Sequence, residues 1–287
     1  MKNLIFIAVI MINFAFMACE EIPPSIDNST SSDTTFISSV IPSADVKNVL
    51  IEEFTGVACL NCKDGHDEID KLKETYGKRL IPIGSHAIDV FSDPGRISHS
   101  VPDLRSEDGL NAANLHGLPG SLPSAVIDRT NFIGEQETVV SLNKWAGFVA
   151  QRINESTPVN ISISILSHDS INQNIIFEVE VTLTQTIEKE LALSIALLED
   201  KVAAPQLNGS VWLEDYLQPH VLRDYLTAYN GKSLNSNNIA GRTYQFRFLE
   251  KYNSSWAPSE IELVAFVHYA GDDEKQYEVI QAVNTYL

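Results

Sequence analysis

The sequence predicts two folded units, a mixed α/β unit followed by an antiparallel β sandwich. Over residues 44–157, short apolar runs alternate with amphipathic segments at helical spacing, which is typical of a sheet with helices on its faces. At Pro158 the pattern of alternating strand and helix signals ends, and β-branched or alternating runs separated by polar turns follow. The chain has 287 residues, 44% of them hydrophobic, which is enough apolar material for two cores. We therefore expect domains at 44–157 and 158–287.

The first unit contains strands and helices in alternation. After the first apolar run, Ile69, Leu72 and Tyr76 recur at helical spacing, and Gly77 stands where a helix C-cap is expected. The predicted elements are strands at 49–55, 80–88 and 124–128 and helices at 63–76, 104–115 and 137–154.

The second unit is predicted to be almost entirely β. A single helix is expected near 213–229, and the other ordered segments are short apolar or alternating runs between turns, as in a sandwich. The predicted strands are 159–166, 175–184, 191–198, 244–249, 261–269 and 279–283.

The N-terminal segment predicts export. Lys2 precedes an apolar run of 15 residues at 4–18, broken only by Asn13, which has the form of a secretory signal. The run is shorter than the roughly 20 residues that a membrane-spanning helix requires. It ends at Cys19 and resembles a lipobox, in which this cysteine carries diacylglycerol. We expect a signal peptide at 1–18 and a lipid anchor on Cys19, the alternative being an ordinary signal with a free cysteine.

The residues after Cys19 predict a tether. Residues 19–43 carry few large apolar side chains and are expected to be flexible. Glu20 and Glu21 resemble the acidic pair that directs some lipoproteins to the cell surface, or else belong to the solvated tether. The net charge of −18 repels phosphate backbones, so no nucleic-acid partner is expected.

One motif carries chemistry. Cys59-Leu-Asn-Cys62 follows a strand and opens a helix, where unpaired N–H groups favour a thiolate on the first cysteine and the second lies one turn on. A permanent disulfide is the alternative, and a metal site using His66 as a third ligand is another. A c-type haem would need a histidine directly after Cys62, and Lys63 stands there instead.

The segment from Ile51 to Cys62 resembles the active-site region of thioredoxin-like proteins. In that resemblance, Cys59 matches the exposed attacking cysteine and Cys62 the resolving one. Glu53 matches the buried acid that assists proton transfer, and Pro123 matches the cis-proline that faces the sulfurs.

A wider resemblance covers most of the chain after the tether. The matching segments are 49–56, Cys59-x-x-Cys62, 85–86, 124–129, 219–224, 264–267 and 279–282. Together they resemble the lipoprotein family related to outer membrane protein twenty-eight. The resemblance implies a thioredoxin-like domain joined to an immunoglobulin-like sandwich, and an outer-membrane or cell-surface location.

These observations lead to two expectations for function. The first is thiol-disulfide exchange on exported proteins, with Cys59 attacking and Cys62 releasing the product. The second is a non-enzymatic surface protein that binds an envelope or surface partner and in which the disulfide is structural. In either case the sequence calls for no cofactor and no bound metal, and membrane attachment is expected through the lipid on Cys19.

Overall fold

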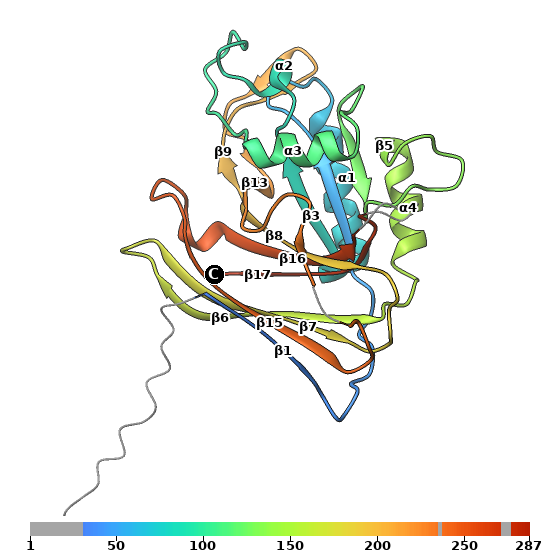
Figure 1. Cartoon of the computed structure of the whole chain (residues 1–287). Coiled ribbons are helices and arrows are strands. Elements are labelled where there is room, and N and C mark those ends of the chain that lie inside the picture. The colour runs from blue at the N-terminus through green and yellow to red at the C-terminus, as the bar shows by residue number, and fades with distance from the viewer. Residues whose placement is uncertain (1–30, 235–236, 271–276) are drawn as a thin grey trace, which may run out of the picture.

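The computed structural model describes residues 31–234, 237–270 and 277–287 (Figure 1). The predicted signal peptide at 1–18 and the predicted anchor Cys19 lie outside the described residues. Within the described part of the chain, no helix is both long and apolar enough to cross a membrane.

The first unit is a four-stranded mixed sheet with helices on both faces. The strands lie in the order β3-β2-β4-β5; β2 and β3 are parallel, and the other pairs are antiparallel. Helix α1 buries Ile69 and Leu72, as the spacing predicts, and ends before Gly77, whose φ is 60°. The elements are β2 (Val49–Phe54), α1 (Cys62–Tyr76), η1 (Gly77–Arg79), β3 (Leu80–Ser85), α2 (Asp89–Ser92), α3 (Glu107–Leu115), β4 (Ser124–Ile127), β5 (Val139–Ser141), η2 (Leu142–Lys144) and α4 (Trp145–Arg152).

The second unit has two facing sheets. One has the order β1-β15-β7-β6, and the other contains β17, β16, β8 and β13, with β14 also paired to β8. All six predicted strands of this unit are confirmed. The elements are β6 (Val159–Asp169), β7 (Asn174–Leu183), β8 (Leu191–Glu199), β9 (Val202–Ala203), β10 (Gln206–Asn208), β11 (Val211–Leu213), β12 (Leu217–Gln218), β13 (Val221–Tyr225), β14 (Lys232–Ser233), β15 (Arg242–Lys251), η3 (Pro258–Glu260), β16 (Ile261–Tyr269) and β17 (Val279–Tyr286).

The two units share one sheet. Strand β13 pairs antiparallel with β8 and parallel with β3, where Gly84 N donates to His220 O at 2.7 Å. The sheet therefore runs without a break through β17-β16-β8-β13-β3-β2-β4-β5. Strands β8 and β16 are almost completely buried, because one face packs on the other sheet of the sandwich and the other face packs toward α3. The sequence-based division at Pro158 marks a change of topology within one connected body.

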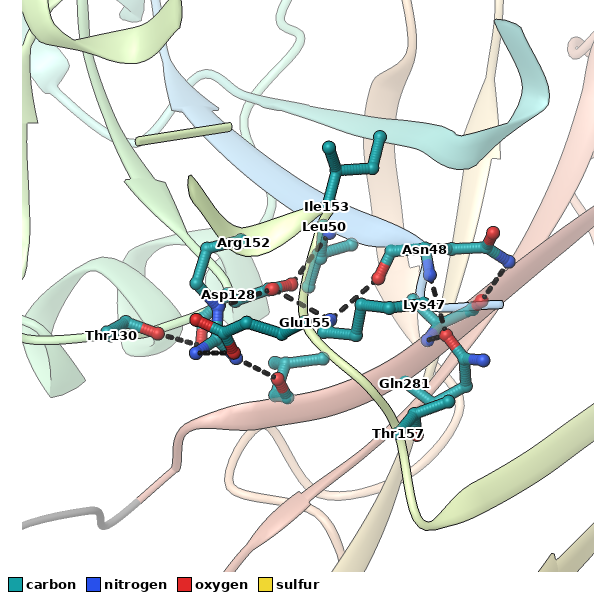
Figure 2. A network of polar contacts seen from close by, with 12 residues as sticks. Lys47, Asn48, Leu50, Asp128, Thr130, Arg152, Ile153, Glu155, Thr157 and Gln281 are labelled. Atoms are coloured by element: carbon teal, nitrogen blue, oxygen red, sulfur yellow. Dashed lines mark hydrogen bonds and ion pairs between the residues drawn. The ribbon is translucent and has the colours of Figure 1, made fainter. Parts of the chain in front are cut away.

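A buried network of charges ties the two units together (Figure 2). The Asp128 carboxylate binds Lys47 Nζ at 2.7 Å and Arg152 Nε at 2.9 Å. Arg152 in turn reaches β17, with Nη1 2.9 Å from Glu278 Oε1 and Nη2 donating to Val279 O at 3.0 Å. Burial lowers the pKa of Lys47, and Asp128 opposes that shift. Because each buried charge depends on its partner, removing Asp128 is expected to be strongly destabilising.

Two predicted helices differ from the structure. The helix predicted near 213–229 is wrong: β11, β12 and β13 occupy that segment. Strand β13 lies between β8 and β3 in the shared sheet. Its backbone hydrogen bonds with these two strands outweigh the helical spacing of its apolar residues. The helix predicted at 137–154 begins only at Trp145, because Val139 and Val140 pair with β4 as an edge strand.

Part of the predicted tether is ordered. The structure places β1 (Ser32–Ile37) within the predicted flexible segment 19–43, paired antiparallel with β15. All six side chains of β1 are exposed. Its backbone hydrogen bonds to an available sheet edge therefore order this segment without apolar burial, which composition could not reveal.

Candidate functional site

The Cys59–Cys62 pair forms a disulfide at the beginning of α1, with the two Cα atoms 5.4 Å apart. The loop that carries Cys59 leaves the end of β2, and its position is held by Thr55 N donating to Ser85 O and Ala58 N donating to Phe91 O, each at 3.0 Å. Both sulfurs are engaged with each other, so neither is a free thiolate for the metal site that the sequence left open.

Glu53 and Pro123 lie together against α1. A Cβ added at Gly65, one turn after Cys62, would collide with Glu53 Oε1 and lie 2.9 Å from Pro123 Cβ. The peptide bond between Leu122 and Pro123 is cis. The four residues that the sequence singled out thus come from β2, the start of α1 and the loop before β4. Their chemical roles stay predictions.

Glu53 is a buried acid with an unpartnered oxygen among the described residues. Its side chain is about 2% exposed, and Oε1 has no hydrogen-bond partner within the described part of the chain. Burial raises the pKa of Glu53 well above its ordinary value, and the Asp70 carboxylate adds to the shift. The surroundings therefore favour the protonated form of this carboxyl, and a carboxyl with a raised pKa is suited to proton exchange.

Glu52, the adjacent residue, points to the opposite face of the strand, where hydrogen-bond donors surround its carboxylate. Its carboxylate accepts two hydrogen bonds of 2.8 Å from Arg129 and one of 3.0 Å from Tyr225 Oη. Burial alone would raise the pKa of Glu52, but Arg129 outweighs burial and lowers it to about 2. Glu52 is a permanently charged structural partner, whereas Glu53 is not.

His66 joins the site to a distant part of the sequence. Its ring lies 3.1 Å from Thr55 Oγ1 through Nε2 and 2.7 Å from Tyr216 Oη through Nδ1. Nε2 is also 3.8 Å from Glu53 Oε1. Burial lowers the pKa of His66 to about 4, so the ring is neutral at pH 7 and one nitrogen accepts while the other donates. Sequence reasoning considered His66 only as a metal ligand and missed Thr55 and Tyr216.

The expected exposure of Cys59 is wrong. Cys59 is 2% exposed and Cys62 is 0% exposed, although Leu60 between them is 51% exposed. The segment 202–218, which we call the lid, lies against the loop that carries Cys59. It consists of β9, β10, β11 and β12 and the turns between them. Its Leu207 N donates to Val57 O at 2.8 Å.

The His86 ring, which follows β3, is buried and interacts with the Gln218 side chain of the lid through a hydrogen bond. Burial lowers the pKa of His86 to about 3, which keeps the ring neutral. His86 is thus a buried neutral residue near the site.

Comparisons with known proteins identify relatives by sequence and by fold. The family model described as "Outer membrane protein Omp28" matches residues 113–286. No curated protein matches the chain. Among solved structures, HBP35 of Porphyromonas gingivalis superposes with a TM-score of 0.67 at 17% identity, covering 86% of this chain and 77% of that one. This similarity shows a shared fold.

A second solved structure is a domain of the outer membrane lipoprotein Omp28 from Porphyromonas gingivalis. It is 17% identical and covers 46% of this chain and 88% of its own, with a TM-score of 0.30. A superposition at that score supports no conclusion about fold. The match to the family model, which spans more than half of the chain, is the stronger finding.

Proposed function

Because this chain belongs to the Omp28 family of outer membrane proteins, we propose that it is a lipid-anchored outer-membrane protein whose Cys59–Cys62 pair exchanges disulfides with other exported proteins. The observation that carries the proposal is the placement of the disulfide at the start of α1 with the buried carboxyl of Glu53, whose pKa is raised by burial, packed against the same helix. A helix N-terminus favours a thiolate, and a buried carboxyl nearby can return a proton from its acid form and take one in its carboxylate form.

The proposal includes a thioredoxin-like first unit and an immunoglobulin-like second unit. The thioredoxin-like unit is supported by the strand order β3-β2-β4-β5 and by helices α1 and α4, which pack together in one apolar cluster on one face of the sheet. Helix α3 covers the other face, with Ala112 buried against Ile81 and Ile83. The immunoglobulin-like unit is supported by two facing, mostly antiparallel sheets that enclose a single apolar cluster.

The exchange reaction balances as a two-electron transfer. In the reduced protein, the Cys59 thiolate attacks one sulfur of a substrate disulfide, forming a mixed disulfide and releasing the other substrate sulfur as a thiolate, which takes the proton of the Glu53 carboxyl in this proposal. The Glu53 carboxylate that remains then takes the Cys62 proton, and the Cys62 thiolate attacks Cys59 Sγ and displaces the second substrate sulfur, which is protonated from water. The substrate leaves as a dithiol, and the Cys59–Cys62 disulfide is restored.

The alternative is a surface-binding protein with a permanent disulfide. The observation that favours it is the burial of both sulfurs, since a disulfide that no thiolate can reach does not turn over. The two functions differ in the reduction potential of the pair. A potential typical of structural disulfides, below about −300 mV, favours the alternative.

Trapping with serine variants tests the proposal. In Cys62→Ser, Cys59 still attacks but its product is not released, so mixed disulfides with envelope proteins accumulate and disappear on reduction. In Cys59→Ser they do not form. If neither variant traps a partner, and dithiothreitol fails to reduce the folded wild-type pair, the exchange function is refuted.

A further inference from the structure

We infer that the lid, residues 202–218, gates the disulfide, and that Cys59 exchanges only from a state in which the lid has moved away. The inference rests on the proposed function and adds its regulation. The starting observation is that Cys59 is 2% exposed although it lies in a surface loop next to the exposed Leu60. An attacking thiolate must reach the sulfur along the S–S axis, so the closed arrangement is unreactive.

The lid binds the cysteine loop through backbone hydrogen bonds. Leu207 N donates to Val57 O at 2.8 Å, and Gly209 N donates to Leu60 O at 2.9 Å. Strand β10 therefore runs along the loop that contains Cys59 and occupies acceptor groups that a substrate polypeptide would otherwise meet. A substrate must displace the chain's own segment.

Two buried glutamines of the lid form hydrogen bonds that hold it against the cysteine loop. Gln206 Nε2 donates to Cys59 O at 3.1 Å and to Gly56 O at 3.3 Å, and the side chain is 0% exposed. Gln218 Nε2 donates to Gln206 Oε1 at 3.1 Å. These contacts place lid side chains directly on the carbonyl of the reactive cysteine.

Two aromatic contacts, at Trp212 and Tyr216, also hold the lid against the first unit. The Trp212 ring stacks on His99 with centroids 4.2 Å apart, and His99 Nε2 lies 3.1 Å from Glu214 Oε2. Tyr216 stacks on His66 and shares the 2.7 Å hydrogen bond already described. His99 belongs to the loop before α3 and His66 to α1, so the lid is held from two sides.

The outer part of the lid, β10 and β11, can leave without unfolding either core. The lid pairs with itself, β9 with β12 and β10 with β11, and it contributes no strand to the two large sheets. At its base, Ala204 stays buried in a small cluster with Val57 and Val221. Figure 1 shows the segment after β8 extending past β9 toward the end of the molecule where α2 lies. Val211 on β11 is more than half exposed even in the closed arrangement.

The test is the rate at which dithiothreitol reduces the pair in the full-length protein, followed by quenching, alkylation and mass spectrometry. Trp212→Ala removes the stack on His99 and is expected to speed reduction about two- to tenfold, the range that aromatic pairs of this kind are worth. Val211→Ala, next to it on β11 and facing solvent, is the matched control and is expected to reduce at the wild-type rate.

A second variant removes most of the lid while keeping its base. Replacing residues 205–215 by Asn-Gly joins Ala204 to Tyr216, which already face each other with Ala204 N donating to Tyr216 O at 3.1 Å. We expect this excision to give the fastest reduction of all. Should it fail to fold, Trp212→Ala and Tyr216→Phe carry the test.

The outcomes separate the lid from the exchange function. Faster reduction in the lid variants, with mixed disulfides trapped more readily when Cys62→Ser is combined with Trp212→Ala, supports the inference. Trapping by Cys62→Ser with wild-type reduction rates in every folded lid variant overturns the lid and leaves the exchange function standing. Faster reduction without trapping in any background overturns the exchange function, and with it the lid's role as its regulator.

Discussion

Replacing Glu53 by glutamine is expected to stabilise the protein, by an amount that grows with pH. Glu53 is buried and without a hydrogen-bond partner among the described residues, and burial raises its pKa well above the ordinary value. In the unfolded chain the same carboxyl ionises with a pKa of about 4.3. Above that pH the folded state holds a proton that the unfolded state has lost.

The sign and size follow from proton linkage. Between the unfolded and the folded pKa of Glu53, the wild-type free energy of unfolding falls by about 1.4 kcal/mol for each pH unit. Glutamine does not ionise, so Glu53→Gln removes this loss. The variant and the wild type are expected to be equally stable near pH 4, and the variant more stable above it by an increasing margin until the folded pKa is reached.

Urea unfolding of the oxidised protein, followed by circular dichroism from pH 4.5 to 8.5, measures this difference. The matched control is Glu52→Gln on the same strand. Because the pKa of Glu52 is lowered to about 2, its ion pair with Arg129 is complete above about pH 5, and the control is destabilised by an amount independent of pH above that value. A Glu53→Gln difference that stays constant with pH would refute the reasoning from burial.

Three further outcomes are expected. Asp128→Asn leaves the buried Lys47 without its carboxylate, and Arg152 with Glu155 and Glu278 alone, and should cost about 3–5 kcal/mol of unfolding free energy; Asp67→Asn, at a partly exposed pair, should cost less than about 1 kcal/mol. Cys19→Ser should release the protein from the membrane fraction or stop its processing; normal trimming with continued membrane association would contradict the anchor. Residues 44–157 and 158–287 expressed separately should not unfold cooperatively, because the shared sheet is cut; a cooperative transition in either half would restore the sequence-based division.

The sequence predicted best those elements whose own residues decide their structure. Strands β8 and β16 are mostly apolar, with few polar residues such as Ser194 and Glu262, and mostly apolar strands are typical of sheets that are buried on both faces. Helix α1 has its apolar residues at helical spacing and ends before a glycine with positive φ. The disulfide also follows from local spacing, since the two cysteines are separated by only two residues.

The sequence failed where an element depends on a partner far along the chain. Strand β13 forms because it lies between β8 and β3, and β1 forms because β15 offers an open edge. Neither segment has a pattern that separates it from a helix or a tether. Their structure comes from backbone hydrogen bonds with strands that local spacing does not reveal.

Within the candidate site, the sequence by itself determined the cysteine pair, its place at a strand-to-helix junction and the acid six residues before Cys59. Tertiary structure alone decided which of two adjacent glutamates is paired and whether Cys59 is accessible. The physical reason is sequence separation: Gln206 donates to Cys59 O across 147 residues, and Tyr216 meets His66 across 150. Burial and pairing at these groups depend on side chains that only the folded chain brings together.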